Sequence, residues 1–305
     1  MLDAISGAHV YGKNIIQAEA FTEIRIDWDE HPGMIKSLGD RNLALGANRM
    51  VHHVFTHNPW LDRKPGMTLD RVGLYFQRDQ TWWDQVNGWT GYLQRCQALL
   101  QMGAPVVDVA VFTGEEIPRR AITPERLVSS LPGIFGDDLI RSEQERLENR
   151  GSPMRELPRG VRTTDNMADP EEWIDPLRGY AYDSFNKDAL LRLSKVDNGK
   201  ITLPGGLAYS LLIIPGSRPL SPNAGIMSAE VAERILKLVK DGATVVFTEK
   251  PEHTPGLSYY AENEKRLGAL TEELFGSEKH FIQTGGERVV EVRNIGKGRI
   301  IPVSY

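Results

Sequence analysis

A single carboxylate directly follows a predicted strand and is the first candidate for chemistry. The apolar run NIIQA, residues 14–18, predicts a short buried strand, and Glu19 comes next. In barrels of parallel strands, functional groups sit at the C-terminal strand ends, where the loops and the open mouth lie. Glu19 is therefore a candidate catalytic residue, with a plain solvated loop carboxylate as the alternative.

Two histidines form a second candidate group. His53 and His57 stand four residues apart in the segment RMVHHVFTH, residues 49–57, whose Val, Phe and Thr content predicts a strand. His52 falls on the opposite face, because side chains alternate along a strand. Such histidines can hydrogen-bond sugar hydroxyls or bind a metal, whereas packed or capping histidines are the alternative. The HExxH pattern of zinc proteases is absent, so zinc is not indicated.

Tryptophans supply flat apolar surfaces on which sugar rings can stack while neighbouring groups bond the hydroxyls. Trp60 and Trp83 are candidates for such contacts, whereas the helical spacing around Trp89 favours the core. The loop GSRPLSP, residues 216–222, lies where parallel α/β sheets bind ligands. It lacks the glycine patterns of nucleotide-binding loops, and no GxSxG nucleophile elbow occurs.

The elements around the candidate residues predict a first domain over residues 1–103. After a loop-like start, the segment HPGMIKSLGDRNLALG, residues 31–46, predicts a helix, and a second, long helix is predicted over residues 81–103. Together with the strands over residues 14–18 and 49–57, these elements give the order strand, helix, strand, helix.

The remaining residues, 104–305, predict a second α/β domain with a parallel sheet. Buried strands such as PVVDVAVF and AYSLLIIPG alternate with amphipathic helices such as MSAEVAERILKLVKDG, which is the pattern of crossover units. The turn Asp197, Asn198, Gly199 predicts a hairpin. Residues 113–176 are polar and aperiodic and predict a long insertion. The second domain is therefore predicted to be flavodoxin-like, with a doubly wound parallel sheet.

Composition and charge exclude several classes of protein. The net charge is -5 and both signs are mixed along the chain, so no basic surface for nucleic acid is predicted. Cys96 is the only cysteine, which excludes an internal disulfide. No apolar run is long enough for a membrane span and the first residues lack a signal peptide, so no membrane partner is expected and the compartment is left open.

Residues 8–118 resemble the end of the catalytic barrel of glycoside hydrolase family 106, the α-L-rhamnosidases. The segments that carry the resemblance, in the family's order and spacing, are AHVYGKNIIQAEAFT, GANRMVHHVFTHNPW, PGMTLDRVGLYFQRDQTWW and YLQRCQALLQMGAPVVDVAVFTGE. Later segments resemble the flavodoxin-like domain that follows this barrel, among them YAYDSFNKDALL, GGLAYSLLIIPG and KDGATVVFTEK. The resemblance implies the C-terminal part of a (β/α)8 TIM barrel followed by a flavodoxin-like domain.

By this resemblance Glu19, in the AEAFT segment, is the general base in an inverting hydrolysis of terminal α-L-rhamnosides. His53 and His57 match histidines at the barrel mouth, and Asn58 stands where the family has glutamine. An inverting enzyme also needs a carboxylic acid, which in this family lies well upstream of AEAFT. The chain is therefore expected to be a fragment that supplies the base half of the site and is inactive alone.

The expected partner is a rhamnose-containing glycan or glycoside, and the missing barrel half on another polypeptide is a second candidate partner. No cofactor is expected in this chain, although the resemblance associates calcium with the full-length family, whose members are often exported. Two alternatives stay open: a non-catalytic flavodoxin-like module for carbohydrate binding or interaction, and a barrel glycosidase of β-galactosidase type. The AEAFT and HHVFTHNP segments argue against the second alternative.

Overall fold

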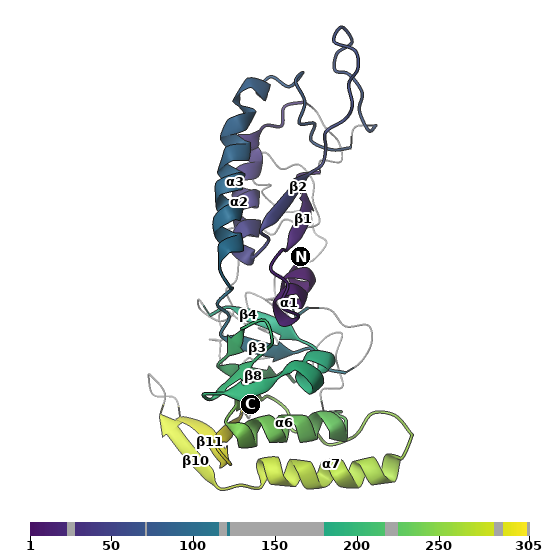
Figure 1. Ribbon diagram of the computed structural model, residues 1–305. Helices are drawn as coiled ribbons and strands as arrows, with labels where there is room; N and C mark the ends of the chain where they lie inside the picture. Colours follow the sequence, from purple (N-terminus) through teal and green to yellow (C-terminus); the bar gives the residue numbers. More distant parts are fainter. Residues whose placement is uncertain are drawn as a thin grey trace. The chain divides into compact units, whose positions relative to one another are not determined.

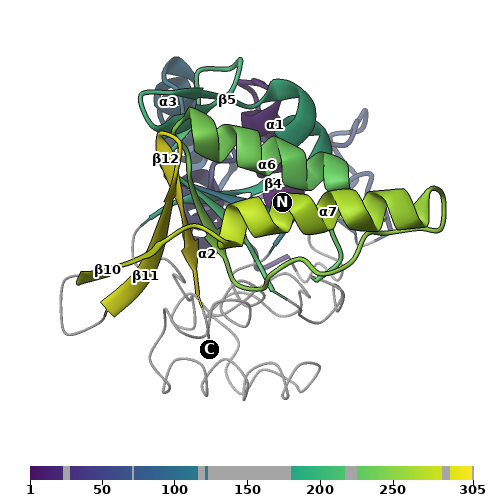
Figure 2. The same ribbon diagram turned by 90° about the horizontal axis from the view of Figure 1, so that it is seen from below.

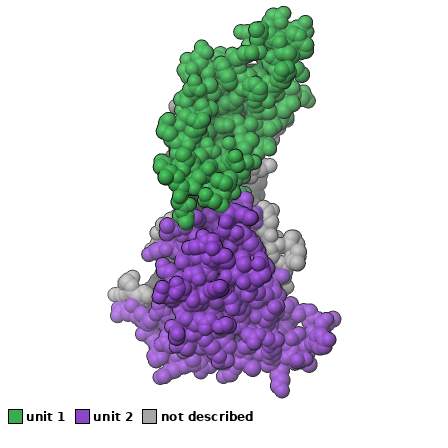
Figure 3. All heavy atoms as spheres, in the orientation of Figure 1, with its two compact units in different colours: residues 1, 14–104, 152–173 green, residues 2–13, 105–151, 174–305 purple. Residues whose placement is uncertain are grey.

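The residues of the chain form two compact units. The computed structural model describes residues 1–22, 28–70, 72–115, 121–122, 180–216, 225–283 and 289–303. Unit 1 contains Met1 and residues 14–104 and 152–173, and unit 2 contains residues 2–13, 105–151 and 174–305 (Figure 3). The predicted division between residues 103 and 104 differs from these units at residues 2–13, which group with unit 2, and at residues 152–173, which group with unit 1.

Unit 1 is built from a pair of parallel strands backed by two helices (Figure 1). Strand β1 is Gln17–Ala20, strand β2 is Arg49–His52, and helix α2 is Pro32–Leu45. The short helical turn η1, Trp83–Gln85, leads into helix α3, Val86–Met102, which packs beside α2. A cluster of buried side chains fills the space between the helices and the strands: Leu43, Ala47, Met50, Leu74, Phe76, Trp89 and Leu93.

Helix α2 has the ends that its sequence predicts. Its N-cap is His31, whose Nδ1 accepts a hydrogen bond from the Gly33 amide at 3.2 Å, and Pro32 occupies the first turn. Gly46 ends the helix with a φ of 117°, a left-handed conformation that glycine adopts without strain. The helix predicted over residues 31–46 is confirmed.

The first strand differs from its prediction. The apolar run 14–18 predicts a strand that ends before Glu19, whereas β1 begins at Gln17 and includes Glu19. Ahead of β1 the Ile16 amide donates to the Asn48 side-chain oxygen at 2.8 Å, while the Ile16 carbonyl accepts from the Arg49 amide of β2 at 3.1 Å.

The second strand is shorter than predicted. The β-prone segment 49–57 forms a strand only as far as His52. Beyond it the chain pairs with a later segment: the Val54 amide donates to the Leu74 carbonyl at 2.8 Å, and the Phe76 amide donates to the Val54 carbonyl at 2.9 Å. These bonds tie residues 74–76 to the segment just beyond β2, while the sheet of unit 1 in the described residues consists of β1 and β2.

Unit 2 contains one mixed sheet, which has seven strands in the described part of the chain. Five are parallel, in the spatial order β4 (Tyr182–Phe185), β3 (Val109–Phe112), β8 (Leu211–Ile214), β9 (Thr244–Phe247) and β12 (Gly298–Pro302). Strands β11 (Val289–Ile295) and β10 (Lys279–Gln283) continue the sheet antiparallel beyond β12. A separate antiparallel sheet contains β5 (Lys195–Asp197), β6 (Lys200–Thr202) and β7 (Ala208–Tyr209). The predicted α/β class, with a largely parallel sheet, is confirmed.

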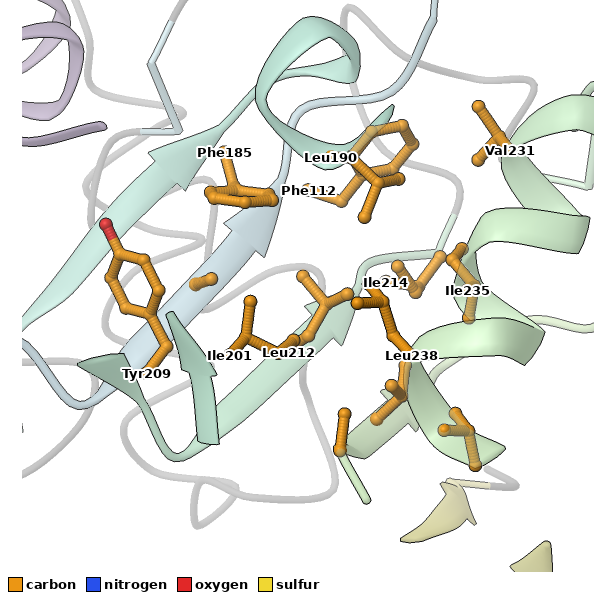
Figure 4. Packing of buried hydrophobic residues seen from close by; sticks show 14 of the residues in the cluster. Phe112, Phe185, Leu190, Ile201, Tyr209, Leu212, Ile214, Val231, Ile235 and Leu238 are labelled. Atoms are coloured by element: carbon orange, nitrogen blue, oxygen red, sulfur yellow. The ribbon is translucent and has the colours of Figure 1, made fainter. Parts of the chain in front are cut away.

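Two long helices of unit 2, α6 (Ala229–Asp241) and α7 (Tyr260–Phe275), lie side by side (Figure 2). Helix α6 begins as predicted at Ser228, whose hydroxyl accepts from the Val231 amide at 3.3 Å, and ends at Gly242. Its apolar face packs over the sheet and the short helix η4 (Ala189–Leu193), as Figure 4 shows. The labelled side chains of this core include Phe112, Phe185, Leu190, Leu212, Ile214, Val231, Ile235 and Leu238.

The first residues form a helix rather than the predicted loop. Helix α1, Leu2–Val10, packs against β4 in unit 2. The Nδ1 atom of His9 lies 2.9 Å from Asp183 Oδ1, and the Tyr209 hydroxyl donates to Asp183 Oδ2 at 3.0 Å. Asp183 is 1% exposed, so these bonds satisfy a buried carboxylate. Tertiary contacts of this kind stabilise a short helix whose own apolar pattern is weak.

Other predictions in unit 2 have mixed outcomes. The hairpin turn is confirmed, because Asn198 and Gly199 have φ of 49° and 76°, the positive values that a tight hairpin requires. Strand β10 has no counterpart in the sequence prediction and forms through pairing with β11. Most of the insertion predicted over residues 113–176, and most of the loop 216–222, lies outside the described residues.

A cavity-forming substitution tests the core of unit 2. Leu212 is fully buried on β8, so we expect Leu212→Ala to lower the free energy of unfolding by about 2–5 kcal/mol. Urea unfolding followed by far-UV circular dichroism measures the change. Leu257→Ala is the control, since Leu257 is 91% exposed and its loss should change this free energy by less than about 0.5 kcal/mol. Equal losses in the two variants would contradict this core.

Candidate active site on strands β1 and β2

The strand pair of unit 1 has one covered face and one open face. In the parallel register Gln17 pairs with Arg49 and Glu19 pairs with Val51, and these four side chains are exposed. The alternate side chains point to the helices and their buried cluster; they are Ala18, Ala20, Met50 and His52. Because the register is fixed, all side chains of the open face project in one direction.

Glu19 lies on the open face, one residue before the C-terminal end of β1. Its side chain is exposed and makes no hydrogen bond or ion pair within the described ranges. The backbone then turns at Phe21, which has a φ of 65°, and the Phe21 ring lies edge-on to Trp89 with 5.5 Å between ring centroids. Phe21 thus holds the end of the strand to the helix side, while Glu19 faces away from it.

His53 continues the ladder by one residue, because its amide donates to the Ala20 carbonyl at 3.1 Å. By alternation His53 belongs to the same face as Glu19. Its Cα lies about 7 Å further along the strand direction than that of Val51, the partner of Glu19. The Nδ1 atom of His53 is buried and has no hydrogen-bond partner among the described residues. Unsatisfied buried polar atoms are rare in folded proteins and are often found at functional sites.

His52 packs against the buried cluster of unit 1, on the face opposite to His53, as predicted. The indole N–H of Trp89 donates to His52 Nε2 at 3.0 Å, and the imidazole lies edge-on to Phe76 with 4.3 Å between ring centroids. Burial lowers the pKa of His52 below its ordinary value, because the charged ring would lose its water. His52 therefore supports the strand pair from behind and is not a candidate for sugar contact.

The structure does not bring the remaining predicted residues to Glu19. His57 is exposed in the loop that follows β2. Trp60, 47% exposed in the same loop, lies under the Arg63 guanidinium at 5.0 Å. Trp83 is half-buried at the start of η1 and packs against the buried cluster. Over the part of the chain that the structure describes, no hydrogen bond or ring contact joins these side chains to Glu19.

The sequence patterns missed a pocket beside the helix starts. It has a volume of about 400 Å³ and is lined in part by Trp28 and His31, ahead of α2, and by Trp82 and Trp89, near the start of α3. Trp28 stands in the stretch FTEIRIDWDE, which has no helical or strand periodicity. Only the presence of an isolated tryptophan among acidic residues could have pointed to it.

In the described ranges, no three His, Cys, Asp or Glu side chains are grouped so as to hold a metal ion. No described helix combines the length and the apolar character that crossing a membrane requires. Cys96 is a free thiol, half-buried in α3.

The buried His52 gives unit 1 a predicted dependence on pH. Its pKa in the folded chain lies below the unfolded value of about 6.5, so the unfolded chain takes up a proton first as the pH falls. The stabilisation from the neutral ring is therefore complete above pH of about 6.5 and decreases as the pH falls toward the folded-state pKa. We expect His52→Gln to remove this decrease in the free energy of unfolding between about pH 6.5 and 5, measured by urea unfolding monitored by tryptophan fluorescence.

The control for this prediction is His57→Gln, which changes an exposed histidine of the same unit and should leave the pH dependence as it is. A direct measurement is the NMR titration of the His52 ring. A folded-state midpoint at or above about 6.5 would contradict the prediction.

Comparisons with known proteins show the family of the chain. A model of glycoside hydrolase family 106, alpha-L-rhamnosidase, matches residues 1–152 and 162–301. A protein of Formosa agariphila named "Putative beta-glucuronidase" is 34% identical over 269 residues, 88% of this chain and 18% of that protein. The structure of a rhamnosidase from Novosphingobium sp. PP1Y matches with a TM-score of 0.67 and 29% identity, over 98% of this chain and 22% of that one. The chain thus spans about a fifth of the length of these relatives. It belongs to glycoside hydrolase family 106, the family of the α-L-rhamnosidases.

Proposed function

We propose that this chain supplies the general-base half of the active site of an inverting α-L-rhamnosidase, with Glu19 as the base. The observation that carries the proposal is the place of Glu19 near the C-terminal end of a parallel strand, on the face that the helices leave open. Catalytic groups of parallel-strand barrels have this position. Membership of the family and the likeness to a rhamnosidase structure support the class of reaction.

The proposal includes the fold that such an enzyme needs: the last strands of a TIM barrel in unit 1 and a flavodoxin-like domain in unit 2. In unit 1 strand, helix, strand and helix follow one another, the strands are parallel, and both helices cover the same face. A barrel wall is built in this way, with the other face toward the lumen. In unit 2 the parallel strands, numbered in chain order, are arranged 2-1-3-4-5, which is the flavodoxin order.

In the proposed reaction the Glu19 carboxylate accepts a proton from a water molecule as the water attacks the anomeric carbon of the rhamnoside. The attack comes from the face opposite the leaving group, so the configuration inverts. A carboxylic acid about 6.5–9.5 Å from the base must donate a proton to the leaving oxygen. The chain spans about a fifth of the length of its relatives. We propose that this acid lies in a part of the enzyme that corresponds to the other four fifths.

His53 is the proposed sugar contact nearest the base. Alternation beyond β2 puts it on the face of Glu19; its ring is half-buried with Nδ1 covered beside Gly73, so Nε2 is the nitrogen that we propose for the contact. An imidazole nitrogen accepts from, or donates to, a sugar hydroxyl. His57, Trp60 and Trp83 lie further along the chain, in the loop after β2 and at η1, and we propose them as contacts with more distant units of the glycan.

The proposed partners follow from placing the base in this chain and the acid elsewhere in the enzyme. The ligand is a rhamnose-containing glycan, and the remaining barrel strands are the protein partner of unit 1. Calcium, which the resemblance associates with the full-length family, is proposed to bind outside the residues that the structure describes, because these hold no cluster of acidic or histidine side chains suited to a metal.

Glucuronides are a second candidate class of substrate, because of the name of the Formosa relative. The carboxylate of a glucuronide calls for a cation beside the sugar. Arg49 is on the open face, but it lies four residues before His53. It is therefore about 13 Å further from the C-terminal strand ends, where the proposed barrel opens. We therefore favour rhamnosides, whose ring carries no charge. Membership of family 106 argues against the β-galactosidase type.

A chimera tests the role of Glu19. Residues 1–305 replace the matching part of the Novosphingobium rhamnosidase, and hydrolysis of 4-nitrophenyl α-L-rhamnoside is measured, with the chain alone assayed in parallel. We expect Glu19→Gln to lower kcat by about 10²–10⁴, because an amide cannot accept the proton of the attacking water. Proton NMR of the first product should show the β-anomer of rhamnose, as inversion requires.

The matched control is Glu262→Gln, which replaces an exposed glutamate on α7 and should leave kcat unchanged. Circular dichroism and gel filtration verify that each variant is folded. An unchanged kcat in a folded Glu19→Gln chimera would refute the base assignment. Hydrolysis by the chain alone would refute the assignment of the acid to another part of the enzyme.

A further inference from the structure

The pocket beside the starts of α2 and α3 is separate from the face that carries Glu19. Trp89, one of its lining residues, contacts His52 and Phe21 on the helix side of the strands, whereas Glu19 points to the opposite side. Its volume of about 400 Å³ falls in the range of pockets that hold small ligands, about 300–1,000 Å³.

The pocket has an aromatic lining that is held in place. The Trp28 ring stacks on Tyr75 with 5.4 Å between centroids and 19° between planes. Tyr75 is fully buried, and its hydroxyl donates to the Val72 carbonyl at 2.8 Å and accepts from the Leu69 amide at 2.7 Å. Trp28 itself is 38% exposed, so one of its faces is backed and the other is available. A rigid, half-exposed indole is the surface on which a sugar ring stacks.

The polar groups of the pocket are arranged around apolar ring surfaces. The indole N–H of Trp82 donates to the Glu30 carbonyl at 2.9 Å, and that of Trp89 is taken by His52, so both rings present carbon atoms. In His31, Nδ1 accepts from the backbone as the cap of α2, so in the neutral ring Nε2 carries the proton and can donate. Hydrogen-bonding groups around aromatic faces suit a ligand with apolar faces and hydroxyl edges.

The charge of the lining selects among sugars. Asp29 and Glu30 contribute to the wall, and the lining residues that the structure describes include no lysine or arginine. A uronate, sulfated or phosphorylated sugar would bring a negative charge beside these two acidic residues, and the described part of the lining offers no lysine or arginine to pair it. A neutral sugar meets no such repulsion, and its hydroxyls can donate to the carboxylate oxygens.

We propose that this pocket is a subsite for a neutral pyranose unit of the glycan, apart from the catalytic face. The identity of the glycan rests on the proposed function, but binding in the pocket needs no hydrolysis. Trp28 is its stacking platform, Trp82 and Trp89 form its apolar wall, and His31 with the two carboxylates bonds the hydroxyl groups. The subsite gives the enzyme a preference for glycans that extend beyond the cleaved rhamnose.

The proposal is tested on the 305-residue chain labelled with 5-fluorotryptophan, whose fluorine NMR signals are assigned with single Trp→Phe variants. Methyl α-L-rhamnopyranoside and the neutral disaccharide rutinose are the probes, and methyl β-D-glucuronide is the charged comparison. We expect the Trp28 and Trp82 signals to shift saturably with the neutral probes, with dissociation constants on the order of millimolar, and not to shift with the glucuronide.

Two variants separate the pocket from other sites. Trp28→Ala should weaken the ligand-dependent shift of the Trp82 signal about tenfold, whereas Trp28→Phe, which keeps a ring, should weaken it less. Phe55→Ala removes another exposed aromatic side chain of unit 1, 68% exposed, and should change nothing. Dispersed fluorine signals in every variant show that the chain remains folded.

The outcomes distinguish this proposal from that for Glu19. Absence of any saturable shift at Trp28 and Trp82 in the folded chain would overturn the subsite, whatever the chimera hydrolyses. An equal shift with the glucuronide would overturn its preference for neutral sugars. A saturable neutral-sugar shift that also persists in Glu19→Gln supports a separate subsite, even if that substitution leaves hydrolysis unchanged.

Discussion

The parallel pairing of β1 with β2 is the interaction on which the proposed site depends. Side chains alternate along a strand, so the register that pairs Glu19 with Val51 also directs four side chains toward the helices: Ala18, Ala20, Met50 and His52. A shift by one residue would place the Glu19 carboxylate among apolar side chains, at a cost of several kcal/mol for an unpaired charge. Helices α2 and α3 therefore fix the direction of Glu19 indirectly, through the apolar residues that they cover.

The two units differ in how completely they bury their sheets. All four residues of β3 in unit 2 are buried, and apolar clusters lie on both sides of the central strands. In unit 1 the helices cover one face only, and the other face carries Glu19. The chain leaves unit 2 after Lys13 and re-enters it at Pro105. Just before the first of these points, the contact of His9 with the buried Asp183 fixes α1 to β4. Unit 1 is thus joined to unit 2 at both ends of its main segment.

Much of the regular structure is predictable from the sequence where local signals agree with the final packing. The helix that starts at Ser228 and stops at Gly242, and the turn at Asn198 and Gly199, have caps and backbone angles that the residue types dictate. The helix α1 is not predictable in this way, because its stability depends on a buried carboxylate 174 residues later in the chain. For the same reason the sequence indicates Glu19, at a strand end, but not the pocket at Trp28, which is assembled from two distant loops.

The alternation of the two strands can be measured directly by cysteine scanning in a Cys96→Ser background. Single cysteines replace each residue of β1 and β2 in turn, and their rates of reaction with a thiol reagent are compared. The account predicts fast reaction at residues 17, 19, 49 and 51 and slow reaction at residues 18, 20, 50 and 52, as their exposure implies. The opposite pattern, or equal rates along both strands, would contradict the open face on which the role of Glu19 rests.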